Sequence, residues 1–147
     1  TGILPVTQDE AGLAVVMGHE IAHAIARHGN ERMSQALAIQ GAGMTLEALT
    51  ASKPGLTRDI FLQSYGIGSQ PGMLAYSRKH ETEADKMGLV FMAMAGYDPR
   101  SAPAFWQRMA AGGGSKPPEF LSTHPSDETR VHDLEAYMPE ALKYYKP

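Results

Sequence analysis

Residues 18–29, GHEIAHAIARHG, place three histidines and a glutamate in a stretch otherwise rich in alanine and isoleucine. His19 and His23 are four positions apart, so on a helix they lie about 40° apart around the axis and can reach one metal ion. Glu20 follows His19 directly and can take a proton from a water molecule at the metal without being a ligand. This HExxH spacing predicts two zinc ligands and a general base. The alternative is a pair of surface histidines on an amphipathic helix.

A third histidine, His28, does not suit the position of third ligand. In the metzincin pattern the third histidine follows the second by six residues, with a glycine between them. Here the interval is five residues and 24–27 contain no glycine. On a continuous helix, His28 would point about 140° away from His23. We therefore predict that His28 is no ligand and interacts with the dipole at the C-terminal end of the helix.

The segment 77–88, SRKHETEADKMG, offers a better third ligand. Glu81 and Asp85 are four positions apart and share a helix face, whereas Glu83 is turned away from both. Glu81 can complete a His-His-Glu set that leaves a fourth position open for water, as a catalytic zinc requires. Asp85 can accept a hydrogen bond from the second nitrogen of a ligand histidine. The alternative is a solvated acidic face beside neighbouring basic residues.

Composition narrows the class of protein. The chain has 147 residues, enough for one domain with its own core. Hydrophobic residues make up 43% and charged residues 20%, as in globular proteins, and the net charge of -3 gives no general attraction to nucleic acid. Without cysteine, a metal must be bound by nitrogen and oxygen. No segment approaches the roughly 18 apolar residues of a membrane span, and no signal peptide is visible.

Hydrophobic spacing and capping signals predict a mainly helical domain. The segment 2–6 is expected to end a short strand at Pro5, so that β structure is confined to the N-terminus. Thr7 and Glu10 match a capping box that starts the first helix, and Gly29 is expected to end it. Further helices are expected at about 31–51, 73–95, 102–111 and 126–145. A glycine-rich loop or weak helix end is expected at 65–72, and a flexible loop at 112–118.

Several other residues are expected to be structural. His80 and His132 are expected to be exposed. Tyr76 is expected to pack rather than to donate to a transition state. Methionines at core-like spacing on the helices are expected to pack; they are Met17, Met33, Met44, Met87, Met92, Met94 and Met109.

The HExxH motif, followed far downstream by SRKHETEAD, resembles the zinc peptidases of the HtpX and CAAX-prenyl-protease type. These form metallopeptidase family forty-eight within the gluzincins, and the soluble bacterial and mitochondrial Oma-type members share a pattern close to that of the N-terminal motif here. The resemblance extends from Thr1 through 122–130. It implies one zincin-like catalytic domain over 1–147, lacking an N-terminal segment, with one zinc ion per chain. It implies His19, His23 and Glu81 as zinc ligands, Glu20 as the base and Asp85 as the partner of a ligand.

A third motif, THPSDETR, resembles the HP-x4-R element that lies beside the cleft in this family. His124 can steady a developing oxyanion. It can also occupy the open coordination position and hold the enzyme latent. Arg130 can grip a substrate carbonyl or anchor the loop to a carboxylate. The alternative for both is ordinary loop packing.

The sequence thus predicts a zinc-dependent endopeptidase acting on polypeptides. The resemblance implies quality control of unfolded or misassembled proteins, in the bacterial periplasm or cell envelope. Relatives bind substrate along a sheet edge that precedes the HExxH helix, and almost nothing precedes that helix here. The rival hypotheses are a latent zinc-bearing binding or chaperone-like module and a metal-free helical interaction protein. The oligomeric state is not predicted.

Overall fold

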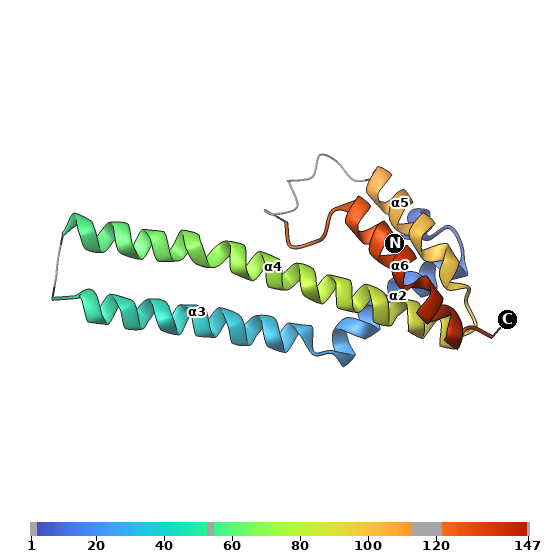
Figure 1. Ribbon diagram of the computed structural model, residues 1–147, viewed down its shortest axis with the longest axis horizontal. Helices are drawn as coiled ribbons and strands as arrows, with labels where there is room; N and C mark the ends of the chain where they lie inside the picture. Colours follow the sequence, from blue (N-terminus) through green and yellow to red (C-terminus); the bar gives the residue numbers. More distant parts are fainter. Residues whose placement is uncertain (1–2, 53–54, 113–121, 147) are drawn as a thin grey trace.

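The computed structural model describes residues 3–52, 55–112 and 122–146. Within these ranges the chain is helical and contains no strand, which confirms the mainly α fold. Two regions stand apart in Figure 1: a cluster of helices around both termini and a long antiparallel pair extending from it. The elements in order are α1 (Leu4–Thr7), α2 (Glu10–Ile25), α3 (His28–Thr50), α4 (Leu56–Met94), η1 (Pro99–Ser101), α5 (Ala102–Gly112), α6 (Asp127–Ala141) and η3 (Leu142–Tyr144).

The N-terminal strand expected at 2–6 is wrong, because Leu4–Thr7 form the short helix α1. Pro5 lies in the first turn of α1, where its fixed φ suits a helix and its missing N–H costs nothing. Thr7 ends α1 instead of capping the next helix. The N-cap of α2 is Asp9, whose carboxylate accepts a hydrogen bond from the Gly12 amide at 2.8 Å.

The first long helix also ends earlier than expected. Arg27 adopts a left-handed conformation, with φ 56°, so α2 ends at Ile25 and α3 begins at His28. Gly29 therefore lies inside α3 and is not a helix stop. His28 stands at the start of one helix rather than in the last turn of another, which removes the expected interaction with a C-terminal dipole.

The loop or weak helix end expected at 65–72 is also wrong, because α4 runs without interruption through it. Pro71 lies inside this helix of 39 residues. Tertiary contact with α3 accompanies the unexpected helix: the Tyr65 hydroxyl donates a hydrogen bond to the Ile39 carbonyl oxygen at 2.9 Å. Helices at 102–111 and 126–145 are confirmed in outline by α5 and by α6 with η3. Most of the expected 112–118 loop lies outside the described residues.

The hydrophobic core lies between α2, the C-terminal part of α4, α5 and α6. Helices α2 and α4 approach so closely that a Cβ at Gly18 would lie 2.8 Å from the Gly88 carbonyl oxygen. This crossing brings the HExxH motif against the segment that contains Glu81 and Asp85. The buried core residues are Val15, Leu89, Met92, Ala102, Phe105, Leu134 and Ala141.

The packing prediction for the methionines is right for Met92, which is buried, and for Met109, which packs against the core. It is wrong for the exposed methionines Met17, Met33, Met44 and Met94. The last four project from helix faces that the described chain leaves uncovered. None of the described helices combines the length and the apolar character needed to cross a membrane.

Candidate metal centre

Three potential metal ligands converge where α2 crosses α4. One ligand atom from each of His19, His23 and Glu81 lies within 4.8 Å of the others. The two histidine Nε2 atoms are 3.0 Å apart, and the Glu81 oxygens lie 3.3 Å from His23 Nε2 and 3.6 Å from His19 Nε2. Ligands about 2.0–2.1 Å from a tetrahedral zinc lie about 3.3–3.4 Å from one another. The spacing and the donor types of this cluster therefore fit zinc.

The orientation of His19 is set by a carboxylate on its far side. Asp85 Oδ1 lies 2.8 Å from His19 Nδ1, and both side chains are buried. A neutral His19 that donates its Nδ1 hydrogen to Asp85 has its lone pair on Nε2, facing the cluster. This is the contact that the sequence predicted for Asp85, while its importance for activity stays a prediction.

Arg130 joins the two carboxylates from α6. Its Nε donates to Asp85 Oδ2 at 2.6 Å, and its Nη2 donates to Glu81 Oε2 at 2.9 Å. The guanidinium lies 3.8 Å from the ring centroid of Trp106 and is buried. These contacts fit the second of the two roles considered from the sequence, which is to anchor the loop to a carboxylate, while the role itself stays a prediction.

Charge around Glu81 keeps its carboxylate ionised. Burial raises the pKa of Glu81, but hydrogen bonding and nearby positive charge outweigh this and lower it to about 2. The lowering comes first from the hydrogen bond and charge of His124, then from the charges of His19 and Arg130. An ionised carboxylate in the cluster is an oxygen donor suited to zinc.

His23 is held neutral by its surroundings. Burial lowers its pKa most, and the neighbouring imidazoles of His19 and His28 lower it further against the opposing charges of Glu81 and Glu20. A histidine must be neutral to offer a lone pair to a metal. The electrostatics of the cluster therefore favour the ligand form of His23.

Glu20 follows His19 directly in α2 and is exposed to solvent. Its charge acts on His23. Glu20 is therefore accessible to water at the edge of the His-His-Glu group, as a base outside the ligand set must be.

His124 approaches the same carboxylate from the loop before α6. Its Nδ1 lies 2.9 Å from Glu81 Oε2, while its side chain remains 59% exposed. The loop is held to α4 by a hydrogen bond from Arg78 to the Ser122 carbonyl oxygen at 3.0 Å. The motif THPSDETR thus brings both His124 and Arg130 to Glu81.

The sequence did not indicate that His28 and His80 are buried beside the cluster. His28 Nδ1 lies 2.9 Å from His23 Nδ1. The expectation that His80 is exposed is wrong, since it is 3% exposed and stacks on His28 at 4.3 Å between ring centroids. The expectation for His132 is confirmed, because its side chain is 81% exposed. Tyr76 contacts His80 edge-on, in line with a packing role, although it is 40% exposed. No residue type marks the turn at Arg27 that brings His28 here.

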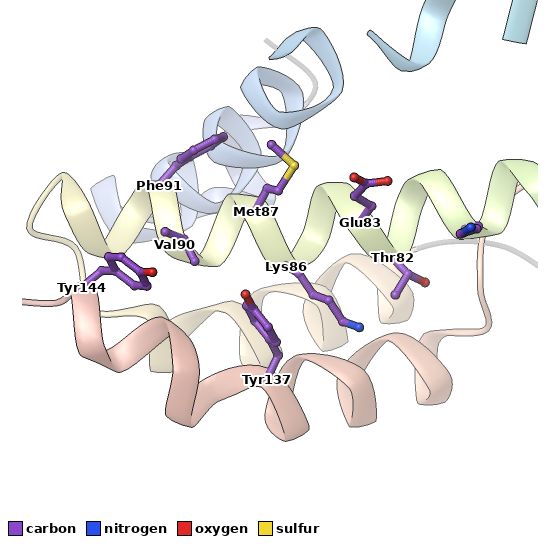
Figure 2. Close-up of a pocket in the computed structure, with 9 residues that line it drawn as sticks. Thr82, Glu83, Lys86, Met87, Val90, Phe91, Tyr137 and Tyr144 are labelled. Carbon is purple, nitrogen blue, oxygen red and sulfur yellow. The ribbon is translucent and has the colours of Figure 1, made fainter. Parts of the chain in front are cut away.

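A hollow elsewhere in the molecule contains none of the cluster residues. It has a volume of about 830 Å³ and lies between α4 and the C-terminal elements α6 and η3. Figure 2 shows Lys86 and Val90 of α4 beside Tyr137 and Tyr144 in this hollow. The convergence of donor atoms, rather than hollow size, identifies the candidate site.

A helical domain that brings an HExxH helix against a downstream glutamate defines a class of metallopeptidase domains. The family described as Peptidase family M48 matches residues 1–138, and the chain belongs to this family. The chain is 40% identical over 144 residues to the mitochondrial metalloendopeptidase OMA1 of Schizosaccharomyces pombe, covering 95% of this chain and 40% of that protein.

Two further relatives extend this comparison. The chain is 39% identical over 150 residues to the mitochondrial metalloendopeptidase OMA1 of Homo sapiens, covering 97% of this chain and 29% of the relative. It is 33% identical over 135 residues to the beta-barrel assembly-enhancing protease of Escherichia coli K12, covering 86% of this chain and 27% of that relative. The chain therefore spans two fifths or less of the length of these relatives. No solved structure shows significant similarity to it.

Proposed function

We propose that residues 1–147 form the catalytic domain of a zinc-dependent endopeptidase that cleaves unfolded or misassembled polypeptides. The observation that carries the proposal is the convergence of His19, His23 and Glu81 within 4.8 Å, with Glu20 exposed beside them. Membership of Peptidase family M48 and relatives named as metalloendopeptidases support the same activity.

The proposal gives each residue of the cluster a role. His19, His23 and Glu81 would hold one zinc ion per chain. When bound, zinc polarises the scissile carbonyl and lowers the pKa of bound water toward about 7. Glu20 takes the proton of the attacking water and passes it to the leaving amine. Asp85 and Arg130 hold His19 and Glu81 in place.

His124 has two roles open to it, as the sequence already indicated. Its exposed ring beside Glu81 is placed to steady a developing negative charge. The same contact supports a second candidate function, a latent zinc-bearing binding or chaperone-like module in which His124 closes the site. Replacing His124 with alanine separates the two roles, since cleavage rises if the histidine blocks the site and falls if it assists.

The substrate class and location rest on the relatives and the family resemblance. A bacterial relative is named as a protease that enhances β-barrel assembly, which supports quality control of misassembled proteins. The bacterial periplasm or cell envelope is the location we infer. Fractionation of cells that produce the full-length protein tests this inference.

Glu20→Gln is the experiment that tests the proposed activity. Gln keeps the shape of Glu20 but cannot accept a proton, so cleavage of unfolded casein should fall about 10²–10⁴-fold. Zinc content, measured by elemental analysis on untagged protein, should stay near one per chain.

Glu10→Gln is the matched control, because Glu10 is also an exposed glutamate of α2 but lies at its first residue. Undiminished cleavage by Glu20→Gln would contradict the assigned base. A wild-type chain that binds zinc without cleaving casein would favour the binding module. A chain that binds no zinc would favour the metal-free interaction protein.

A further inference from the structure

His19 and His23 contact different kinds of side chain through their Nδ1 atoms. Their Nε2 atoms face each other at 3.0 Å, so both Nδ1 atoms point away from the cluster. His19 Nδ1 meets a carboxylate, Asp85, at 2.8 Å. His23 Nδ1 instead meets another imidazole, His28 Nδ1, at 2.9 Å. His28 therefore contacts His23 at the same ring nitrogen, Nδ1, at which Asp85 contacts His19.

We propose that His28 is a positioning residue that accepts a hydrogen bond from His23 Nδ1 and thereby presents His23 Nε2 to zinc. The proposal rests on the proposed function, because it assumes that His23 is a zinc ligand. A neutral imidazole carries one N–H, so a His23 whose lone pair is on Nε2 has its hydrogen on Nδ1. At 2.9 Å one Nδ1 must donate and the other accept. His28 is then unprotonated at Nδ1 and carries its hydrogen on Nε2.

The surroundings of His28 suit this tautomer. Its ring is 3% exposed, so water does not compete for the hydrogen bond with His23. Its Nε2 has no hydrogen-bond partner among the described residues, and the Glu83 carboxylate faces it at 3.5 Å. A negatively charged oxygen on that side favours a hydrogen on Nε2 over a lone pair there.

A second layer holds the ring plane of His28. His80 stacks on it with 8° between the planes and 4.3 Å between the centroids. His80 is itself fixed by Glu31, whose carboxylate oxygen lies 2.8 Å from His80 Nε2. His28 and Glu31 belong to α3, and His80 belongs to α4, so the base of the helical pair clamps the ring.

The backbone supplies an independent observation. On a continuous helix His28 would point about 140° away from His23. Arg27, with φ 56°, turns the chain so that His28 faces back toward His23. Left-handed conformations are uncommon outside glycine and persist where the surrounding structure requires them. Here the conformation delivers the histidine-to-histidine contact.

The test compares two substitutions of His28. In His28→Asn the amide oxygen lies near the former Nδ1 position and can accept from His23, whereas Leu in His28→Leu has a similar size and cannot. Zinc affinity is measured by competition with a chromophoric chelator. The Leu variant should bind zinc about 10–100-fold more weakly, and the Asn variant should stay within a few-fold of wild type. His132→Leu is the control, since this histidine is exposed.

Thermal unfolding of the zinc-free variants separates positioning from packing. Positioning predicts that affinity follows the hydrogen-bond acceptor, with Asn near wild type and Leu weakened, even where Asn unfolds at the lower temperature. Equal losses of affinity in both variants, in step with lost thermal stability, would assign His28 a packing role only and overturn the proposal. So would a Leu variant that binds zinc as tightly as wild type.

A measurement on the wild-type chain needs no variant to fold. Long-range proton–nitrogen NMR correlations of the zinc-loaded protein should show His23 protonated at Nδ1 and His28 unprotonated at Nδ1. A His28 that carries hydrogen on Nδ1 would overturn the proposal while leaving zinc binding intact. A wild-type chain that binds no zinc would instead overturn this inference together with the proposed function.

Discussion

Two regions of this protein, a compact region and an arm, differ in how far their side chains are buried. The compact region comprises α1, α2, residues 77–94 of α4, η1, α5, α6 and η3, and it contains the buried core and the candidate metal site. The arm comprises α3 and residues 56–76 of α4, and it extends away in Figure 1. Of the described residues of the arm, His28 alone is buried. Large apolar side chains are exposed along it: Met33, Leu37, Met44, Leu49, Ile60, Phe61, Ile67 and Tyr76.

The difference shows what a buried polar site requires. In the compact region Arg130, Glu81, Asp85 and His19 are buried together, and each contacts another member of the group. Burial of a charge is costly unless a partner and hydrogen bonds compensate. Among the described residues the arm has few such constraints, and it meets the site at its base, where His28 contacts His23.

The largest expected contrast compares one apolar side chain from each region. Phe105 is fully buried in the core, whereas Leu37 in the arm is 61% exposed. Phe105→Ala should lower the free energy of unfolding by about 3–5 kcal/mol, and Leu37→Ala should change it by about 0.5 kcal/mol or less. Urea unfolding followed by circular dichroism measures both. Similar losses would mean that the arm is packed as tightly as the core.

A contrast of charges comes next. Arg130→Met leaves the buried Glu81 and Asp85 without their shared cation and should destabilise the zinc-free protein by about 3 kcal/mol. Arg58 in the arm pairs with an exposed Glu47 at 3.5 Å, so Arg58→Met should cost about 1 kcal/mol or less. The same urea titrations apply. An Arg130→Met protein as stable as wild type would show that the cluster does not depend on this cation.

Glycine substitutions in the two regions provide the smallest contrast, because one should lower the stability of the protein and the other should raise it. A Cβ at Gly88 would lie 2.9 Å from the His19 backbone nitrogen, so Gly88→Ala should force α2 and α4 apart and cost about 1–3 kcal/mol. A Cβ at Gly66 meets nothing within 4 Å, so Gly66→Ala should stabilise α4 by about 0.5–1 kcal/mol. Melting temperatures give both signs. Zinc affinity should fall in Gly88→Ala alone, and a loss in Gly66→Ala would link the arm to the site.

Much of the candidate site could be predicted from local spacing. His19 and His23 share a helix face because of the helical repeat, and Glu81 and Asp85 do so for the same reason. These relations depend only on a helix being present at each place. The structure brings the two pairs together as the sequence interpretation required, although the assignment of ligands and base remains a prediction.

Predictions made from glycine and proline positions were wrong where tertiary packing outweighed local preference. Glycines and Pro71 at 65–72 predicted a loop or weak helix end, because glycine and proline weaken isolated helices. In the structure α4 continues there alongside α3, with Tyr65 bonded to Ile39. Pro5 predicts the end of a strand, but proline also suits the first turn of a helix, which is the position it occupies in α1.

By itself, the sequence determined the helical class, the HExxH pair and the acidic pair, because each depends on periodicity within one helix. Only the tertiary structure decided how these pairs meet and what surrounds them. The approach of Gly18 to Gly88, the position of Arg130 and the turn at Arg27 all depend on contacts between residues distant in sequence. The residue types at these positions permit many other arrangements, and packing selects one of them.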